Sequence, residues 1–187
     1  TNVLQTRWLS ARAVVEITDL LAIGDSEDNL PLLIRRVRMV SGSARLDLRC
    51  AVRFDYARAA TTVQRAGDDV CFAADGLPGL RLQSSQPLQI TDNAACASFE
   101  LQQDQCAEFI LGAMDDPRFQ ADNGDLCLQR TIKFWRDWIG RSTYRGRWRE
   151  MVNRSALALK LLTSRKHGAI LAAATFGLPE TPGGIRN

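Results

Sequence analysis

The stretch from residue 45 to residue 56 alternates between a mostly charged set and an apolar set of side chains. Alternation of this kind puts one face of a β-strand on a hydrophobic core and the other face in water. We therefore predict a strand over residues 45–56, with Tyr56 at the end of its apolar face. The residues expected to be buried are Leu46, Leu48, Cys50, Val52 and Phe54, and those expected to be exposed are Arg45, Asp47, Arg49 and Arg53.

The rest of the first 113 residues reads as further short strands separated by turn signals. Residues 33–40 form a strand pattern, and Ser41-Gly42-Ser43 predicts a hairpin that joins them to the strand at 45–56. Weaker strand candidates are 3–9, 12–20, 69–74, 79–84, 87–91, 95–102 and 105–112. Many short strands at close spacing, each with one face in water, predict an antiparallel β-sandwich.

After Met114 the spacing of apolar residues becomes helical. Over residues 122–141, Asp122 or Asn123 can cap the start of a helix and Gly140 can end it. Its apolar stripe comprises Leu128, Ile132, Trp135 and Ile139. A second helix follows Gly146, with a broad face made by Trp148, Met151, Val152, Ser155, Ala156, Leu159 and Leu162. The predicted fold class is mainly β with C-terminal helices.

The four tryptophans also fit packing positions. Trp135, Trp138 and Trp148 lie on the helical stripes, and we expect them to pack in the core or between helices rather than to stack on sugars. Trp8 shares a strand face with Leu4 and can be a core residue as well.

The composition is that of an ordinary globular protein. With 45% hydrophobic and 24% charged residues, the chain is not disordered. A net charge of +3 is too small to make a nucleic-acid-binding or membrane-binding surface, and we interpret the late cluster of arginines as a solvated helix face. No run of 18 apolar residues and no secretion signal is present, so the sequence predicts a cytoplasmic protein with no nucleic-acid or membrane partner.

The sequence contains no complete catalytic or metal-binding constellation. Its five cysteines include no C-x-x-C pair and its one histidine is His167, so we expect reduced cysteines, no metal site and no cofactor. His167 is expected to end a helix or to be exposed. No phosphate-binding loop is present, and the scattered carboxylates, including Glu16, Asp19, Asp47 and Asp55, are expected to have surface or capping roles.

The last sixty residues resemble a known family. The segments 127–138, 143–149, 154–163, 168–175, 178–180 and 183–187 are similar to bacterial glycoside hydrolase family 15 proteins, the glucoamylase-like and trehalase-like enzymes. Upstream, the segments 2–8, 15–19 and 52–58 resemble the amino-terminal β-sandwich of the same family, in the same order.

The resemblance implies three regions. These are a super-β-sandwich over 1–113 that lacks its opening strands, a linker helix region over 114–145, and the start of a catalytic α/α toroid over 146–187. In this family a general acid Glu and a general base Glu hydrolyse α-glucosidic bonds with inversion, at roughly 6.5–9.5 Å from each other. Both belong to later helices, so the resemblance implies a non-catalytic amino-terminal portion of a glycosidase. By the same resemblance, the residues placed near the substrate are Glu180, Thr175, Arg186 and Asn187.

Two other interpretations stay open from the sequence. One is a stand-alone sandwich that binds carbohydrate without cleaving it, which needs exposed aromatic side chains, and the other is a purely structural module. If residues 147–163 are the first helix of a toroid, their apolar face was made to meet helices that this chain lacks. We expect that helix to fold back onto the sandwich or onto the 123–140 helix, to pair with another copy through residues 147–175, or to be poorly ordered.

Overall fold

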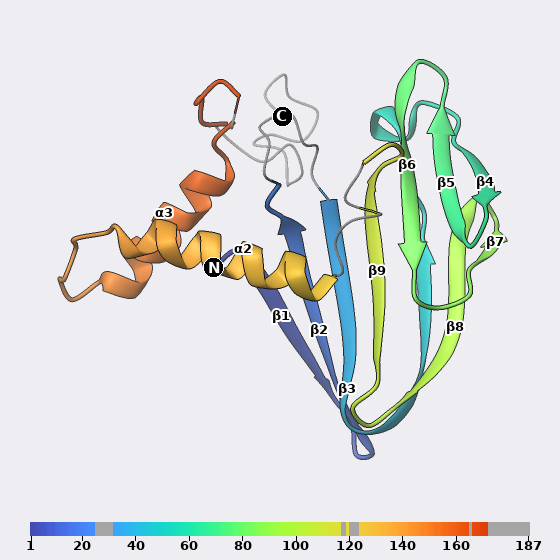
Figure 1. The fold of residues 1–187 in the computed structure, drawn as a ribbon, viewed down its shortest axis with the longest axis horizontal. Coiled ribbons are helices and arrows are strands. Elements are labelled where there is room, and N and C mark those ends of the chain that lie inside the picture. Colours follow the sequence, from blue (N-terminus) through green and yellow to red (C-terminus); the bar gives the residue numbers. More distant parts are fainter. Residues whose placement is uncertain (25–31, 117–118, 120–123, 165, 172–187) are drawn as a thin grey trace, which may run out of the picture. The chain divides into compact units, whose positions relative to one another are not determined.

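The computed structural model describes residues 1–24, 32–116, 119, 124–164 and 166–171. Within these residues, strands occupy most of the chain as far as Ala113, and two helices follow (Figure 1). The strands are β1 (Val3–Leu9), β2 (Ala13–Ala22), β3 (Leu32–Cys50), β4 (Thr62–Ala66), β5 (Asp69–Ala74), β6 (Leu77–Ser84), β7 (Gln89–Thr91), β8 (Ala94–Gln102) and β9 (Cys106–Ala113); the helices are α2 (Gly124–Gly140) and α3 (Arg149–Leu161). The predicted class, mainly antiparallel β followed by helices, is confirmed.

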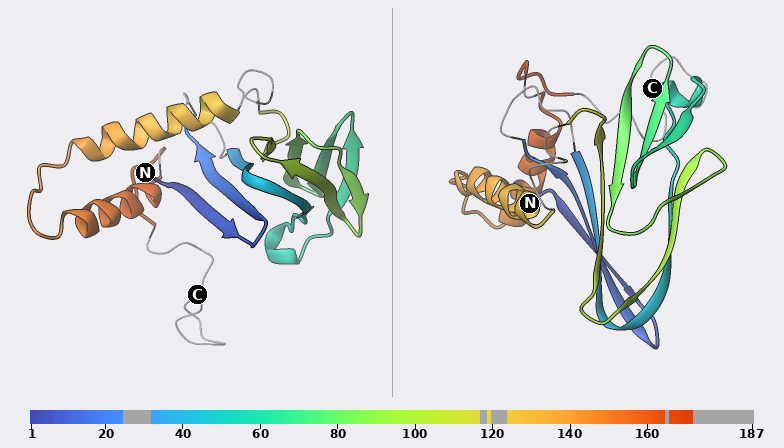
Figure 2. Two further views of the ribbon diagram at one scale, coloured as in Figure 1. Left: turned by 90° about the horizontal axis from the view of Figure 1, so that it is seen from below. Right: turned by 45° about the vertical axis from the view of Figure 1, so that its right-hand side comes forward.

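The chain divides into two compact units. One comprises residues 3–134 and holds all the strands, and the other comprises residues 1–2 and 135–187. The first unit is seen from two further sides in Figure 2. The boundaries predicted from the family resemblance, at residues 113 and 145, remain a prediction.

Every strand pair is antiparallel, and β3 belongs to both layers of the sandwich. Seven strands follow the order β1-β2-β3-β9-β6-β5-β4. The first part of β3 pairs with β2 and β9, whereas residues 43–50 pair with β8, which in turn pairs with the short β7. Strands that pass from one sheet to the other are how sandwiches make their corners.

The predicted hairpin at Ser41-Gly42-Ser43 is wrong, because β3 runs through this segment as one strand of 19 residues. Gly42 has a φ of +74°, and a Cβ added there would lie 1.9 Å from the carbonyl oxygen of Arg12. Beside the bend, the Met39 amide donates to Gln105 O at 3.0 Å and the Asp104 amide donates to Met39 O at 2.9 Å. The glycine therefore bends a strand whose hydrogen bonds continue, and it does not reverse the chain.

Exposed and buried side chains alternate over residues 45–56 in the predicted phase, but the strand ends earlier than predicted. Arg45, Asp47 and Arg49 are exposed, whereas Leu46 and the other apolar residues of this stretch are half-buried against the core and Phe54 is buried. The prediction of a strand beyond Cys50 is wrong. Residues 55–57 have φ values of 46°, 55° and 67°, in the left-handed region that turns a chain. Tyr56 is consequently 77% exposed and does not reach the core.

The other strand predictions differ in their success. The bounds of β1 and β5 are those predicted, and β2, β6, β7, β8 and β9 lie within two residues of the predicted ranges. The strand β4 was not predicted. Its sequence, Thr62-Val-Gln-Arg-Ala66, has one half-buried side chain and four exposed ones, so its apolar pattern is weak.

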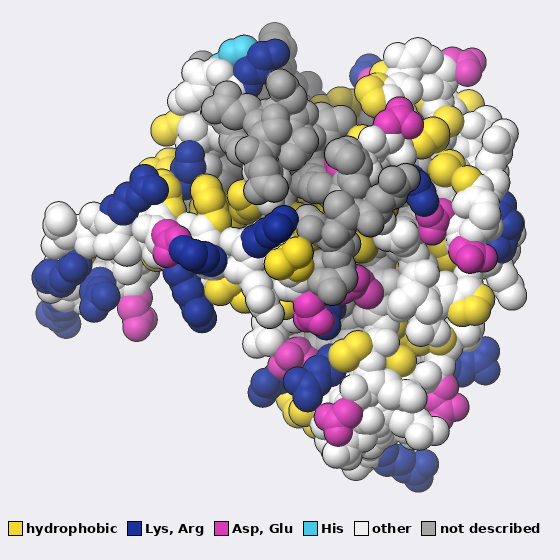
Figure 3. Space-filling model, viewed as in Figure 1, with side chains coloured by type: hydrophobic (Ala, Val, Ile, Leu, Met, Phe, Trp, Pro, Cys, Tyr) yellow, Lys and Arg dark blue, Asp and Glu magenta, His cyan; other side chains and the backbone are white. Residues whose placement is uncertain are grey.

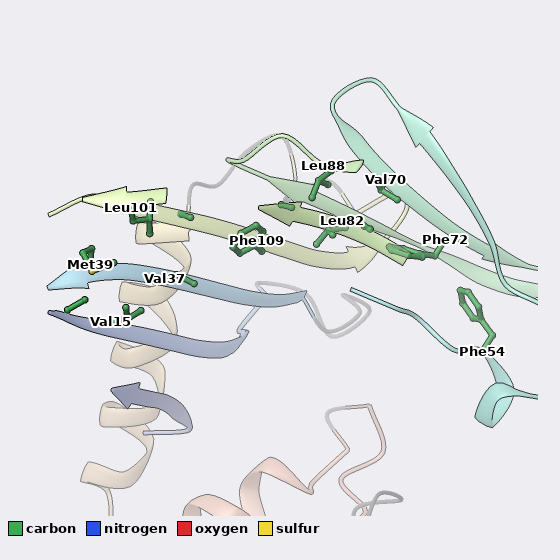
Figure 4. Packing of buried hydrophobic residues seen from close by; sticks show 14 of the residues in the cluster. Val15, Val37, Met39, Phe54, Val70, Phe72, Leu82, Leu88, Leu101 and Phe109 are labelled. Atoms are coloured by element: carbon green, nitrogen blue, oxygen red, sulfur yellow. The ribbon is translucent and has the colours of Figure 1, made fainter. Parts of the chain in front are cut away.

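The larger core lies between the two layers (Figure 4). Met39, Val70 and Phe72 are completely buried, and the rings of Phe99 from β8 and Phe109 from β9 lie 5.7 Å apart. A second cluster lies on the opposite face of β2, β3 and β9 and includes residues of the first turn of α2. Its buried members are Leu20, Ala22, Leu32, Ile34, Ile110, Phe119 and Cys127. The middle of the large sheet is therefore covered on both faces.

The helix α2 was predicted correctly, including its end at Gly140. Its buried positions are Gly124, Cys127, Thr131 and Trp135. Of the predicted stripe, Trp135 is therefore buried, whereas Leu128 and Ile132 are half-buried and the residue before each of them is buried instead. Thr131 Oγ1 accepts a hydrogen bond from the Ile23 amide at 3.2 Å, which gives a polar residue a reason to be buried. The predicted caps Asp122 and Asn123 lie outside the described residues.

The helix α3 was also predicted, but its predicted apolar face is largely open. Trp148, Met151 and Leu159 are 56%, 64% and 53% exposed, so the expectation that Trp148 packs inside the protein is wrong. The buried residue of α3 is Leu157, whose carbonyl oxygen accepts a hydrogen bond from Asn2 Nδ2 at 3.0 Å. The helix therefore packs through a face rotated away from the predicted stripe.

Candidate functional site

The residues predicted to lie near a sugar, Glu180, Thr175, Arg186 and Asn187, lie outside the described residues. Among the residues that the structure describes, no three His, Cys, Asp or Glu side chains form a group that could hold a metal ion. No helix in the described ranges is long and apolar enough to cross a membrane. His167 is exposed, as one of the two expectations for it stated.

Several carboxylates of the sandwich form ion pairs with arginines, and acidic and basic side chains lie next to one another on the face drawn in Figure 3. Asp19 accepts two hydrogen bonds from Arg35, at 2.7 and 2.9 Å, and this interaction raises the pKa of Arg35. Glu16 pairs with Arg7 at 2.8 Å, and Asp55 pairs with Arg58 at 2.7 Å. These acids have the surface roles that the sequence predicted for them. Each is held in an ion pair and is not free to act as a general acid or base.

Two further acids stabilise the junctions between elements. Asp69, which is buried, accepts a hydrogen bond from Arg81 Nε at 2.6 Å. Glu108 of β9 contacts Arg36 at 3.3 Å and accepts a hydrogen bond from the Gly124 amide, in the first turn of α2, at 3.1 Å. A carboxylate at this position satisfies an amide that has no partner within the helix and complements the helix dipole. Its role is to fasten α2 to the sheet.

Three of the five cysteines lie in surroundings that disfavour nucleophilic chemistry. All five are free thiols, and Cys127 is buried. Burial raises the pKa of Cys50, against the opposing influence of Arg35, and burial also raises the pKa of Cys71. Raised values favour the neutral thiol over the reactive thiolate.

Strands β3, β7 and β8 are neighbours in the smaller layer (Figure 1). A hollow of about 440 Å³ lies at these strands. Its lining residues are Asp47, Leu48, Arg49, Gln86, Pro87, Gln89, Cys96, Ala97, Ser98 and Phe99. The strand register places Asp47 opposite Ser98, and Arg49 opposite Cys96, which is in turn opposite Gln89. We call these residues the β3–β8 hollow. It combines one acid, one base, amides and a hydroxyl.

Only part of this hollow could be predicted. The alternation over 45–56 places Asp47 and Arg49 on one exposed face, and the structure confirms this. Gln86, Pro87 and Gln89 come to the same place because β7 pairs with β8 across Asp92-Asn93, whose φ values of 48° and 54° are typical of a tight hairpin turn. No local pattern specifies the pairing of β8 with β3, which is distant in the sequence. No motif of the kind that marks a binding loop is present there.

Comparisons with known proteins give one consistent result. The chain is 31% identical over 210 aligned residues to a trehalase from Mycolicibacterium smegmatis, covering 99% of this chain and 31% of that protein. A trehalase from Mycobacterium tuberculosis is 30% identical over 99% of this chain and 31% of its own length. A trehalase from Thermoplasma acidophilum is 31% identical over the whole of this chain and 33% of its own length. No family model matches the chain.

The chain spans about a third of the length of these curated relatives. One solved structure, assigned as a kojibiose phosphorylase from the human microbiome, aligns with 85% of this chain and 23% of its own, at 11% identity and a TM-score of 0.40. A structural similarity with a TM-score this low supports no conclusion about the fold or the function of this chain. What the comparisons do show is similarity to trehalases from bacteria and archaea along the entire chain.

Proposed function

We propose that this chain is the non-catalytic amino-terminal portion of an inverting, cytoplasmic glycoside hydrolase of family 15 that acts on an α-glucoside, with trehalose as the first candidate. The observation that carries the proposal is the alignment with trehalases over 99–100% of this chain and about a third of theirs. The two catalytic Glu residues would then lie in the part of the relatives that this chain does not match.

The regions implied by the resemblance form part of the same proposal. Residues 1–113 would be the sandwich domain, 114–145 the linker helix region, and 146–187 the start of the catalytic barrel. Glu180, Thr175, Arg186 and Asn187 would lie near the bound sugar without acting as acid or base. The ion-paired state of Asp19, Glu16 and Asp55 supports a non-catalytic role for the sandwich.

The 187-residue chain is expected to release no glucose from trehalose, maltose or maltooligosaccharides. Inverting hydrolysis needs an acid to protonate the leaving oxygen and a base to activate water on the opposite face of the sugar. A coupled glucose assay at high protein concentration measures this directly. Glucose release above a blank that disappears in the Glu180→Gln variant would contradict the proposal.

A chimera tests the positive part of the proposal. Replacing the matching third of the M. smegmatis trehalase with this chain should preserve trehalose hydrolysis, because a homologous sandwich can support the same barrel. The control is the relative without that third. A chimera that unfolds in a single cooperative transition and yet hydrolyses nothing would favour the stand-alone module instead.

One observation favours the alternative, a stand-alone sandwich that binds carbohydrate. Trp8 of β1 is 57% exposed, so the expectation that it can be a core residue is wrong. It lies opposite Val15, on the face of the sheet that carries the larger core. An exposed tryptophan on a sheet face is a typical stacking platform for a sugar ring. Persistent sugar binding by the chain, together with an inactive chimera, would select this alternative.

Self-association through residues 147–175 is the second part of the proposal. Trp148, Met151 and Leu159 are more than half exposed, and Ile170 and Leu171 are 57% and 56% exposed. Covering a large apolar side chain is worth roughly 1.5–3 kcal/mol. Light scattering should therefore give a molar mass above that of the 20.8 kDa monomer, and a chain ending at Asp122 should give a monomer. If both the full chain and the chain ending at Asp122 are monomers, this proposal is contradicted.

A further inference from the structure

We propose that the β3–β8 hollow is a binding site for a neutral saccharide. This inference deepens the proposed function, since it takes from it the substrate class, a glucoside, and assigns a second place where such a molecule is held. The hollow belongs entirely to the sandwich unit and contains no residue of the predicted sugar-proximal set.

The polar side chains of the hollow stand in two neighbouring rows across the strands. Asp47 and Ser98 form one row, and Arg49, Cys96 and Gln89 form the next. Rows on the same face of a sheet are about 6.8 Å apart along a strand and partners are about 4.8 Å apart between strands. Adjacent hydroxyl groups of one sugar ring can therefore reach donors and acceptors from both rows.

Within the described part of the chain, the Asp47 carboxylate has neither an ion-pair nor a hydrogen-bond partner, unlike Asp19, Asp69 and Glu108. Arg49 makes only a weak contact, of 3.9 Å, with Cys96 Sγ. Ser98 Oγ accepts a hydrogen bond from Arg45 Nε at 2.9 Å, which orients the hydroxyl and leaves its proton free to donate. The charged groups of the hollow are thus exposed and available to a ligand.

The charges of the hollow favour a neutral ligand. One carboxylate and one guanidinium line it, so neither an anion nor a cation is preferred on electrostatic grounds. A sugar hydroxyl, by contrast, donates to a carboxylate and accepts from a guanidinium, and a side-chain amide can do both. Pro87, which is exposed, offers a surface for the C–H groups of a pyranose ring, whereas the side chains of Ala97 and Phe99 pack in the larger core.

The position of the hollow disfavours a peptide as the ligand. Peptides that add to a sheet pair with the free backbone groups of an edge strand. At the level of Cys96, β8 is paired with β3 on one side and with β7 on the other. Recognition in the row of Arg49, Cys96 and Gln89 therefore depends on side chains.

The test uses the full 187-residue chain and a titration with trehalose, and separately with maltose, followed by amide chemical shifts in NMR spectra. We expect saturable shifts at residues of the hollow with a dissociation constant in the millimolar range, because no aromatic ring is exposed there to stack on the sugar. Asp47→Asn and Gln89→Ala should each weaken binding, the first by about tenfold, since one charge-assisted hydrogen bond is lost.

Glu100→Gln is the matched control for Asp47→Asn, since Glu100 is an exposed acid in the next row of β8, opposite Arg45 and outside the hollow. It should change the dissociation constant by less than about twofold. Thermal unfolding of each variant verifies that it is folded. The proposal is overturned if neither sugar gives saturable shifts, if the shifts centre on Trp8 instead, or if Asp47→Asn and Glu100→Gln weaken binding equally.

Failure of this site and failure of the proposed function are distinguishable. An active chimera with a sandwich that binds no sugar removes the saccharide site and leaves the glycosidase proposal intact. If the sandwich binds sugar through Asp47 but the chimera has no activity, the saccharide site stands and the glycosidase proposal is removed.

Discussion

Replacing Gly42 by alanine is expected to lower the free energy of unfolding by about 2–5 kcal/mol. The φ of +74° costs a residue with a side chain about 1–2 kcal/mol. The added Cβ would also lie 1.9 Å from Arg12 O, so the backbone of β3 or of the β1–β2 turn must move, at a further cost of about 1–3 kcal/mol. Urea unfolding followed by circular dichroism measures the sum.

Gly76 provides a matched control for Gly42. Its φ of +70° is nearly the same, but a Cβ added there meets nothing within 4 Å. Gly76→Ala should therefore cost only the conformational part, about 1–2 kcal/mol. Equal losses for the two variants would mean that the close approach of Arg12 to the bend contributes nothing.

Phe72→Ala is expected to cost about 3–5 kcal/mol, a large part of the stability of a domain of this size. Phe72 is completely buried in the core between the layers, where its removal leaves a cavity (Figure 4). The matched control is Tyr56→Ala, which removes an aromatic ring that is 77% exposed and contacts Arg58 in a cation–π pair; it should cost no more than about 1 kcal/mol. If the two variants unfold at the same urea concentration, the position of Phe72 in the core is contradicted.

The sequence specified local periodicity well and long-range pairing poorly. The phase of the alternation at 45–56 follows from side-chain chemistry alone, and so do the positions of α2 and α3. The hairpin at Gly42 was mispredicted because a glycine between two polar residues has the same local pattern in a turn and in a bend. Which of the two forms depends on β8 and β9, sixty residues later, whose backbone groups pair along both parts of β3.

The same limit applies to the candidate site. Asp47 and Arg49 were predictable as exposed neighbours because they are two residues apart on one strand. Gln89 is joined to β8 by a local hairpin at Asp92-Asn93, but it reaches Asp47 and Arg49 only because β8 pairs with β3, a long-range pairing that no local pattern specifies. The exposure of Trp8 was not predictable, because an aromatic residue in an alternating strand is usually taken into the core. Among the residues that the structure describes, the smaller layer has three strands, and β1 pairs with none of them.

The passage of β3 through both layers also has a consequence for how the sandwich comes apart. Its 19 residues hydrogen-bond to β2 and β9 in one layer and to β8 in the other, so neither layer has a complete set of strands without it. Local opening of a protein usually releases one supersecondary unit at a time. Here such a partial opening would break the ladder on both sides of Gly42 at once, so we expect the most protected amides of the two layers to exchange with solvent in a single cooperative event.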